Sequence, residues 1–337
     1  MNIKICLIGM GVVETSFLQL LKEKEEFFKR KFDLKFIVNS IFEIDGALIK
    51  EDGIGLKELL NNKKNIKDLP YWKNGLKAID LISKLPIDVC IETTPTNHKT
   101  GEPGLTHITE ALKNHIDVIS SNKGPFYLEY EKIKNLAKEN NCSLKFEATV
   151  ASSVPTLSIR ENLIGNEILS LKAILNGTSN YILSRMIAEG VNFSFALNEA
   201  QEFGYAETDP TLDIEGYDAA GKLVIIANDL LGWSKSINDV KIEGISKITP
   251  QSIELAKSEG YVIKHLAMAE LNELIVKPVL IDKSSPLNIS GTLNVIELQT
   301  KYAGPIILIG RGAGGFEAAS AIINDLVNIG IKRQALS

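Results

Sequence analysis

An acidic run that ends in a lysine is the part of the chain best equipped for chemistry. From Glu207 to Lys222 the sequence reads ETDPTLDIEGYDAAGK, with five acids before the lysine and an apolar run after it. Carboxylates can hold the ammonium group of an amino acid, and a lysine can give a proton to a carbonyl that is becoming an alkoxide. Burial would lower the lysine pKa from its usual value of about 10.4 toward the range in which such a transfer is efficient.

The same run has an ordinary structural interpretation. Asp218 and Lys222 are four residues apart, so on a helix they share a face and can form a surface ion pair. Such pairs are common and contribute little to stability. The carboxylates would also oppose any lowering of the lysine pKa unless another charge balances them. The residues alone therefore leave both interpretations open.

A glycine turn near the start of the chain predicts a phosphate-binding loop. The string ICLIGMGVVETSFLQLL reads as a strand, a turn and a helix, in which Gly9 permits the turn and Gly11 lets a pyrophosphate approach the backbone. The dinucleotide fingerprint has a third glycine where this chain has Glu14. A GxG pair alone is a weak signal, and an ordinary strand–helix turn is the alternative. Its place at the start of an alternating domain favours cofactor binding.

The end of the second expected strand bears on the choice between NAD and NADP. We expect this strand at Leu34 to Val38, so Asn39 and Ser40 follow it, and the nearest acids are Glu43 and Asp45. An acid at the strand tip would bind the ribose 2′-hydroxyl of NAD and repel the 2′-phosphate of NADP. Because we expect no carboxylate at the tip, the sequence leans toward NADP.

The first 150 residues alternate between strands and helices. Strands are expected at 3–8, 34–38, 87–91, 117–120 and 143–147, and helices at 13–31, 102–114 and 127–140. This alternation is typical of an α/β fold of the Rossmann type, with a doubly wound parallel sheet.

The pattern changes after about Pro155. Helices are expected at 178–189, 194–203 and 217–231, followed by strands at 261–271, 273–281 and 293–299. These elements predict an α+β lobe with an antiparallel or mixed sheet. A glycine-rich stretch, GRGAGG, then precedes a last helix at 316–329. We therefore expect a dinucleotide-binding domain of residues 1–154, completed by residues 305–337, and a second domain of residues 155–304.

Composition excludes several classes of function. The chain has 337 residues and a formal net charge of −5, so no basic face for nucleic acid is expected. No run reaches the ~20 apolar residues that a membrane span needs. Cys6, Cys90 and Cys142 are far apart and form no CxxC motif, which indicates structural thiols in a reducing compartment and no transition-metal site. We expect a cytoplasmic protein.

The chain resembles the homoserine dehydrogenase family. The run from Ala200 to Lys222 matches the family signature at every position, with its spacing intact. The segments ILNGTSNYILSRM, SNKGP, GEPGLTHITEAL, FEATVASSVP and GRGAGGFEAA resemble further parts of the family, from Ile3 to about Ile329. The resemblance implies NAD(P)-dependent interconversion of L-aspartate 4-semialdehyde and L-homoserine, a step of threonine and methionine biosynthesis.

The resemblance also implies roles for residues of the second domain. Lys222 would give the proton to the aldehyde oxygen and accept it in the reverse direction, with Asp213 positioning the lysine. Glu207 and Asp218 would bind the substrate. Thr178 would line the substrate pocket, although a threonine at that place also suits a helix N-cap.

Lys123 would lie between the nicotinamide and the substrate, where its charge could polarise the carbonyl. Its alternative role is that of a lysine at a strand end. The residues that would hold the dinucleotide are Gly9, Gly11, Val12, Val13, Thr93, Lys123, Gly204 and Gly314.

The resemblance also implies a site near Glu147 that would bind a monovalent cation such as sodium through backbone carbonyls. The corresponding positions here are Glu147, Val150, Ser152 and Val154. The usual glycine run of the family is replaced by Ala151-Ser152-Ser153.

The chain resembles the short, monofunctional form of the family, without a kinase or an ACT domain. We therefore expect no threonine feedback site, and a homodimer formed through the sheet of the catalytic second domain. Two alternatives stay open: a dehydrogenase of another small amino acid semialdehyde on the same scaffold, and a non-catalytic dinucleotide-binding sensor.

Overall fold

The computed structural model describes residues 1–63 and 65–336, which form two compact units. The first unit contains Met1–Ser152 and the chain from Gly314 onward, and the second contains Ser153–Ala313. The segment 305–313 was expected in the first domain. It belongs to the second unit because its strand pairs with a strand of that unit's sheet.

The first unit is built on a seven-stranded sheet with the order β4-β3-β2-β1-β5-β6-β7. The strands are β1 (Asn2–Ile8), β2 (Lys35–Glu43), β3 (Gly46–Ile49), β4 (Trp72–Asn74), β5 (Val89–Glu92), β6 (Asp117–Ser120) and β7 (Leu144–Lys145). The pairs from β2 through β7 are parallel, and β3 and β4 add an antiparallel edge. The predicted Rossmann-type α/β fold is confirmed, since doubly wound sheets often carry such an edge.

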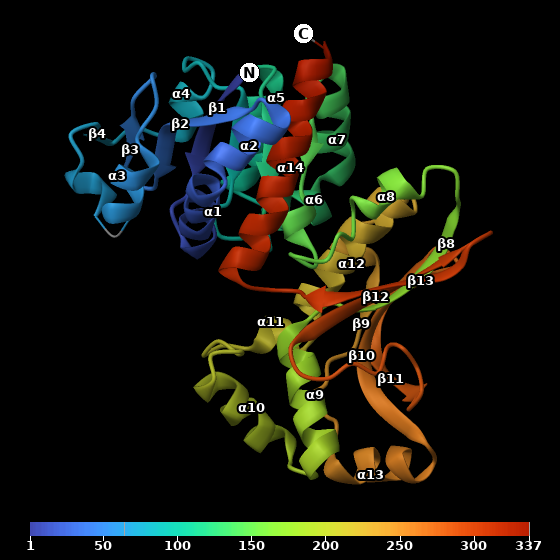
Figure 1. The fold of residues 1–337 in the computed structure, drawn as a ribbon. Helices are drawn as coiled ribbons and strands as arrows, with labels where there is room; N and C mark the ends of the chain where they lie inside the picture. Colours follow the sequence, from blue (N-terminus) through green and yellow to red (C-terminus); the bar gives the residue numbers. More distant parts are fainter. Residues whose placement is uncertain (64, 337) are drawn as a thin grey trace. The chain divides into compact units, whose positions relative to one another are not determined.

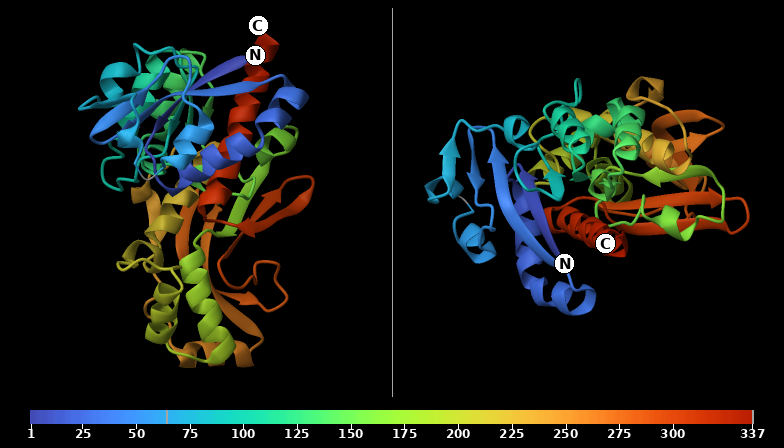
Figure 2. Two further views of the ribbon diagram at one scale, coloured as in Figure 1. Left: turned by 60° about the vertical axis from the view of Figure 1, so that its left-hand side comes forward. Right: turned by 90° about the horizontal axis from the view of Figure 1, so that it is seen from above.

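Helices from both ends of the chain pack in this unit. They are α1 (Val12–Glu23), α2 (Glu25–Phe32), α3 (Leu56–Asn61), α4 (Ala78–Leu81), α5 (Gly104–Lys113), α6 (Gly124–Leu128), α7 (Tyr130–Glu139) and α14 (Gly315–Leu336). Helix α14 lies against α1 (Figures 1 and 2). Their apolar faces meet in one buried cluster that contains Phe17, Leu18, Ile322 and Leu326. Burial of such side chains stabilises the unit by about 1.5–3 kcal/mol each.

Strand β2 is longer than the sequence predicted, and the difference matters for the cofactor. A bulge at Asn39 shifts the register so that Ile5 pairs with Val38 and Cys6 with Ser40. The Asn39 amide donates to the carbonyl of Pro86 at 2.8 Å, so the polar side chain is satisfied inside the sheet. The strand therefore continues to Glu43, and the expectation that no carboxylate stands at its tip is wrong.

The second unit has a six-stranded sheet with the order β13-β12-β8-β10-β11-β9. Its strands are β8 (Ile168–Ile174), β9 (Val240–Ile242), β10 (Tyr261–Glu270), β11 (Glu273–Asp282), β12 (Leu293–Thr300) and β13 (Gly304–Arg311). Its helices are α8 (Ile159–Asn162), α9 (Gly177–Glu189), α10 (Phe193–Glu202), α11 (Thr211–Ile214), α12 (Tyr217–Leu230) and α13 (Pro250–Ser258). The predicted α+β lobe with a mixed sheet is confirmed, although β8, β9 and β13 were not predicted.

No helix within residues 1–63 and 65–336 combines the length and the apolar composition needed to cross a bilayer.

Candidate active site

Lys222 lies on α12 with only 8% of its surface exposed. Its ammonium group donates to the carbonyl oxygen of Leu175 at 2.8 Å and forms an ion pair with Asp218 Oδ2 at 2.7 Å. An ammonium has three N–H donors, so these two contacts fix the place of Nζ. Because both partners are buried, the interpretation of this pair as a solvated surface ion pair is wrong.

The burial of this pair follows from how α12 begins. The N-cap residue, Gly216, has a φ of 88°, which glycine adopts without strain. A Cβ at this position would come within 3.1 Å of side-chain atoms of His265, Ile242 and Val276. The missing side chain thus lets the first turn of α12 approach the sheet, and every residue from Asp218 to Asp229 is buried.

Asn176 joins two acids of the predicted site. Its side-chain amide donates to Asp213 Oδ1 at 2.6 Å and to Asp218 Oδ2 at 3.0 Å. Its side-chain oxygen, Oδ1, accepts the backbone N–H of Ser179 at 2.8 Å, which caps α9. Sequence reasoning did not single out Asn176, although an Asn–Gly pair before a helix is a recognisable N-cap signal.

Burial sets the electrostatics of this cluster. Desolvation and the neighbouring Asp218 raise the pKa of Asp213, while hydrogen bonds from Asn176 and Thr178 and the charge of Lys222 act in the opposite direction. The Thr178 hydroxyl has a single hydrogen, which it can donate either to Asp213 or to the carbonyl of Tyr205 at 2.7 Å. The buried Asp218 and the half-buried Asp213 beside one lysine leave the cluster suited to a cationic group such as a substrate ammonium.

Lys222, Asp218, Asp213 and Thr178 are thus brought together within the second unit. Glu207, also predicted to bind substrate, is different: its side chain is exposed, and its backbone carbonyl accepts a hydrogen bond from the Gln201 side-chain amide at 3.0 Å.

The glycine turn of the first unit lies at the carboxyl end of the parallel strands. Gly9 has a φ of 105°, and its N–H donates to the carbonyl of Phe42 at 2.8 Å. The Thr93 hydroxyl donates to the carbonyl of Ile8 at 3.0 Å, and a Cβ on Gly9 would lie 3.0 Å from that hydroxyl. Helix α1 then begins at Val12, which is 74% exposed.

The start of α14 completes this turn. A Cβ on Gly315 would come within 2.7 Å of Val12 Cγ1 and 2.8 Å of Ser16 Oγ, and Gly314 precedes it with a φ of 131°. The predicted residues Gly9, Gly11, Val12, Val13, Thr93 and Gly314 therefore gather around the N-terminus of α1. A tight turn, an exposed helix start and a positive dipole end fit a dinucleotide pyrophosphate.

Glu14 is the exception to this fit. Only 2% of the residue is exposed, and its Oε2 accepts the N–H of Gly11 at 2.8 Å. The carboxylate therefore occupies one of the backbone donors that a phosphate oxygen would use.

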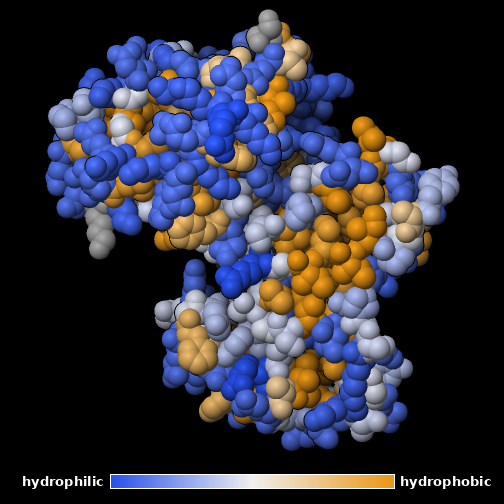
Figure 3. Space-filling model, viewed as in Figure 1, coloured by the Kyte–Doolittle hydropathy of each residue, from blue (hydrophilic) through white to orange (hydrophobic). Residues whose placement is uncertain are grey.

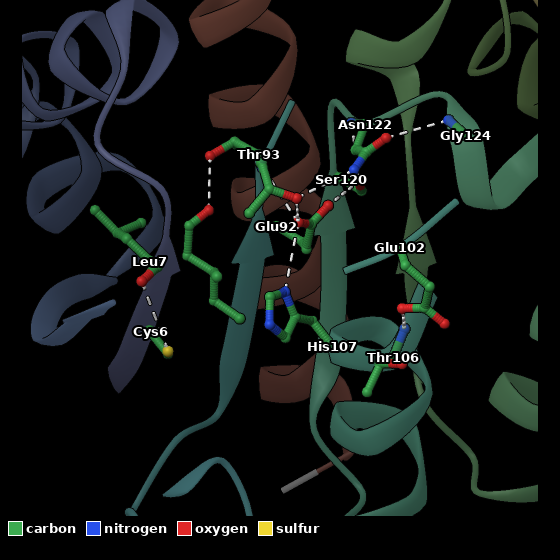
Figure 4. A network of polar contacts seen from close by, with 12 residues as sticks. Cys6, Leu7, Glu92, Thr93, Glu102, Thr106, His107, Ser120, Asn122 and Gly124 are labelled. Carbon is green, nitrogen blue, oxygen red and sulfur yellow. Dashed lines mark hydrogen bonds and ion pairs between the residues drawn. The ribbon is translucent and has the colours of Figure 1, made fainter. Parts of the chain in front are cut away.

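Beside the turn, Glu92 is at the centre of a buried polar network (Figure 4). It accepts the N–H and the hydroxyl of Thr94, the hydroxyl of Ser120 at 3.4 Å, and lies 3.7 Å from His107 Nδ1. Lys123 follows this network after β6, half-buried at the start of α6. Gly204 lies in the second unit, in the turn after α10, with a φ of 72°. The roles of Lys123 and Gly204 stay predictions.

The predicted cation positions fall around a short 3-10 helix, Glu147–Thr149. Val150 follows it, and Ser152 has a φ of 45°, a conformation that usually requires glycine. The serine thus adopts a backbone dihedral angle that is more usual for glycine. Val154 belongs to the second unit. Within the described part of the chain no group of three or more His, Cys, Asp or Glu side chains could hold a metal ion, and the carbonyl site stays a prediction.

Comparison with known proteins gives consistent results. The family model described as homoserine dehydrogenase matches residues 154–327. A homoserine dehydrogenase of Methanocaldococcus jannaschii is 43% identical over 96% of this chain and 98% of its own length. An NAD(+)-dependent homoserine dehydrogenase of Pseudomonas canavaninivorans is 33% identical, over 97% of this chain and 96% of its own.

Solved structures agree with the sequence relatives. A crystal structure from Archaeoglobus fulgidus, assigned as a homoserine dehydrogenase, has a TM-score of 0.90 at 39% identity and covers 97% of this chain and 99% of that one. A mutant hyperthermophilic archaeal homoserine dehydrogenase in complex with NADPH has a TM-score of 0.86 at 26% identity, with 98% of both chains covered.

Proposed function

This chain belongs to the homoserine dehydrogenase family and is an NAD(P)-dependent oxidoreductase, and we propose that Lys222 exchanges the proton in its reaction. The reaction interconverts L-homoserine and L-aspartate 4-semialdehyde. The observation that carries the proposal is the buried contact of the Lys222 ammonium with Asp218 and the Leu175 carbonyl. A nicotinamide dinucleotide, held at the glycine turn around Gly9 and Gly11, would supply or accept the hydride.

The other residues of the cluster prepare the proton transfer. In aldehyde reduction, Lys222 gives a proton from Nζ to the oxygen that becomes the hydroxyl. Asp218 and Leu175 hold Nζ in place, and the Asn176 amide holds Asp213 and Asp218 beside it. The carboxylates favour the substrate ammonium, and we assign that contact to Asp218 and to Glu207, with Thr178 at the pocket wall.

One assay tests both the proposed activity and the choice of cofactor. Purified protein is supplied with L-homoserine and either NAD or NADP, and reduced nicotinamide is followed by absorbance. We expect turnover with homoserine and none above background with other small hydroxy amino acids. Binding of dinucleotide without turnover would favour the sensor alternative.

We further propose that the enzyme prefers NAD, against the leaning of the sequence. The reason for favouring NADP was an expected strand tip without a carboxylate, and β2 ends at Glu43. Glu43 directly follows Phe42, whose carbonyl accepts the Gly9 N–H, so it stands at the level of the glycine turn. A half-buried acid there can bind the ribose 2′-hydroxyl and would repel a 2′-phosphate. We also propose, on the family resemblance alone, that a sodium ion binds at the backbone carbonyls near Glu147.

We also propose a homodimer that acts in the cytoplasm and forms through the sheet of the second unit. Ile309 pairs with Val295, and Val295 pairs with Ile174, so these apolar side chains share one face of the sheet. Ile307 and Ile309 on the edge strand β13 are 36% and 52% exposed. In Figure 3, apolar surface gathers over these strands. Val295 and Ile174 are buried within the chain, so the exposed apolar surface here is that of the edge strand β13, and exposed apolar surface of this kind is typical of a subunit interface.

Mass measurement in solution tests the dimer. We expect twice the chain mass of 37.0 kDa for the wild type and a shift to the monomer for Ile309→Glu. Leu255→Glu, a matched change at a 67% exposed leucine on α13, should leave the dimer intact. A monomeric wild type, or an unchanged mass for Ile309→Glu, would contradict this interface.

A further inference from the structure

Glu14 replaces the third glycine of the fingerprint and lies inside the phosphate-binding turn. Its Oε2 accepts the Gly11 N–H at 2.8 Å and would lie 3.3 Å from a Cβ on Gly11. Its Oε1 would lie 3.3 Å from a Cβ on Gly9. The carboxylate thus spans both glycines of the turn, in the space that their missing side chains leave.

The surroundings of the Glu14 carboxylate disfavour its ionised form. Oε1 is buried and has no hydrogen-bond partner among the described residues. A buried carboxylate oxygen without a partner costs about 1–3 kcal/mol or more, and protonation relieves much of that cost. The geometry alone therefore favours a carboxyl that takes up a proton easily.

The charged groups that face Glu14 from neighbouring strands are both acids. Glu43, at the end of β2, and Glu92, at the end of β5, each act to raise the pKa of Glu14. Helix α14, which packs against α1, has another acid, Glu317, in its first turn. Burial is the largest cause and raises the Glu14 pKa to about 7, against the lowering effect of backbone hydrogen bonds, including that from Gly11.

A dinucleotide adds two more negative charges at the same place. A pyrophosphate at the N-terminus of α1 needs the backbone N–H groups of the turn, including that of Gly11. An ionised Glu14 would compete for this donor and repel the phosphates, whereas a neutral Glu14 would do neither.

We propose that Glu14 is a built-in competitor for the phosphate site, so that dinucleotide binding requires this side chain to take up one proton from solvent and to release Gly11. The inference rests on the proposed dinucleotide site. It makes cofactor affinity depend on pH in a defined direction. Affinity is constant while Glu14 is protonated in the free protein, and it falls as pH rises through the pKa of Glu14, by up to about tenfold per pH unit.

Direct binding measurements on the full chain test this coupling. NADH and NADPH are titrated by calorimetry into the wild type, Glu14→Gly and Glu14→Gln between about pH 6 and about pH 9. For the wild type we expect Kd to rise at least tenfold over the upper two pH units, with uptake of close to one proton seen in buffers of different ionisation enthalpy. Both variants should bind about equally across the range and at least tenfold more tightly than the wild type at the high end.

Controls separate this role from helix capping and from the function itself. Glu14→Gln keeps a polar side chain if Glu14→Gly folds poorly, and Glu23→Gln alters an exposed acid of the same helix, which should leave binding and its pH dependence unchanged. If Glu14 is only a capping residue, the variants lose thermal stability but follow the wild-type Kd at every pH, and the proposal is overturned. If no variant binds dinucleotide at any pH, the proposed function itself fails.

Discussion

The Nζ atom of Lys222 and the Oδ2 atom of Asp218 lie 2.7 Å apart across one turn of α12, and each side chain is only 10% exposed. A contact of this kind at the surface contributes little, but a buried one holds both groups in a single geometry. Its position beside the Asn176 amide makes the pair the fixed centre of the proposed catalytic cluster.

Replacing Lys222 by alanine should remove the proton donor. We expect kcat to fall by about 100-fold or more, the usual scale for a general acid, with dinucleotide Kd unchanged because Lys222 is not among the residues predicted to hold the cofactor. Stopped-flow and steady-state absorbance measure the first quantity, and calorimetry the second. Lys241→Ala is a matched control, since Lys241 forms an exposed ion pair with Glu273 at 3.0 Å. Near-normal turnover of the Lys222 variant would remove the lysine from the mechanism.

Asn176 should act as a positioning residue. Asn176→Ala removes both the α9 cap and the amide that holds Asp213 and Asp218, so we expect kcat/KM to fall more than about tenfold and stability to fall by about 1 kcal/mol. The amide lowers the pKa of Asp213, so its loss should move the acid limb of the pH–rate profile to higher pH.

Asn192 offers the control for this change. It caps α10 through Phe195 at 2.9 Å and has no place in the acid–lysine cluster. Asn192→Ala should lose comparable stability with unaltered kinetics. Equal kinetic effects in the two alanine variants would mean that Asn176 acts through folding alone.

Glu43 should decide between NAD and NADP. Glu43→Ser removes a ribose ligand and a negative charge, so we expect the Kd for NADH to rise by about 10-fold or more and the Kd for NADPH to fall. The ratio of the two constants is the measurement. Glu51→Gln, at an exposed acid of the following segment, should leave the ratio at the wild-type value. A wild type that binds NADPH more tightly than NADH would refute the assignment.

Glu43 also illustrates which part of the fold could not be predicted from the sequence. The alternation of strands and helices predicted the sheet of the first unit, because a period of apolar residues is a local property. The end of β2 was missed because Asn39 and Ser40 are polar, as at a strand tip. The partner that satisfies Asn39 is the carbonyl of Pro86, a long-range contact that no local pattern displays.

The proposed catalytic cluster, too, could be predicted from the sequence only in part. Spacing placed Asp218 and Lys222 on one helix face, and the family resemblance singled out Asp213 and Thr178. Neither revealed that the pair is buried, because burial follows from the close approach of Gly216 to strands distant in sequence. Asn176 was missed for a related reason, since its two acid partners lie 37 and 42 residues farther along the chain.

Lys264 is a buried lysine whose charge should make stability depend on pH. It is 1% exposed on β10, where its ammonium group donates to the carbonyl of Ile289 and to Asn180 Oδ1 at 3.3 Å. Burial lowers its pKa to about 8. The unfolded lysine keeps its proton up to a pH of about 10.4, so between these values the unfolded state binds more protons than the native one.

The free energy of unfolding of the wild type should therefore rise with pH in this window, relative to Lys264→Met, which cannot titrate. We expect the difference between the two proteins to be constant below a pH of about 8 and then to change by up to about 1.4 kcal/mol per pH unit until about 10. Urea unfolding at several pH values measures it, with the slope of each curve checked for two-state behaviour. A difference that stays constant across the window would mean that Lys264 keeps its proton in the folded protein, and that its two oxygen acceptors outweigh the cost of burial.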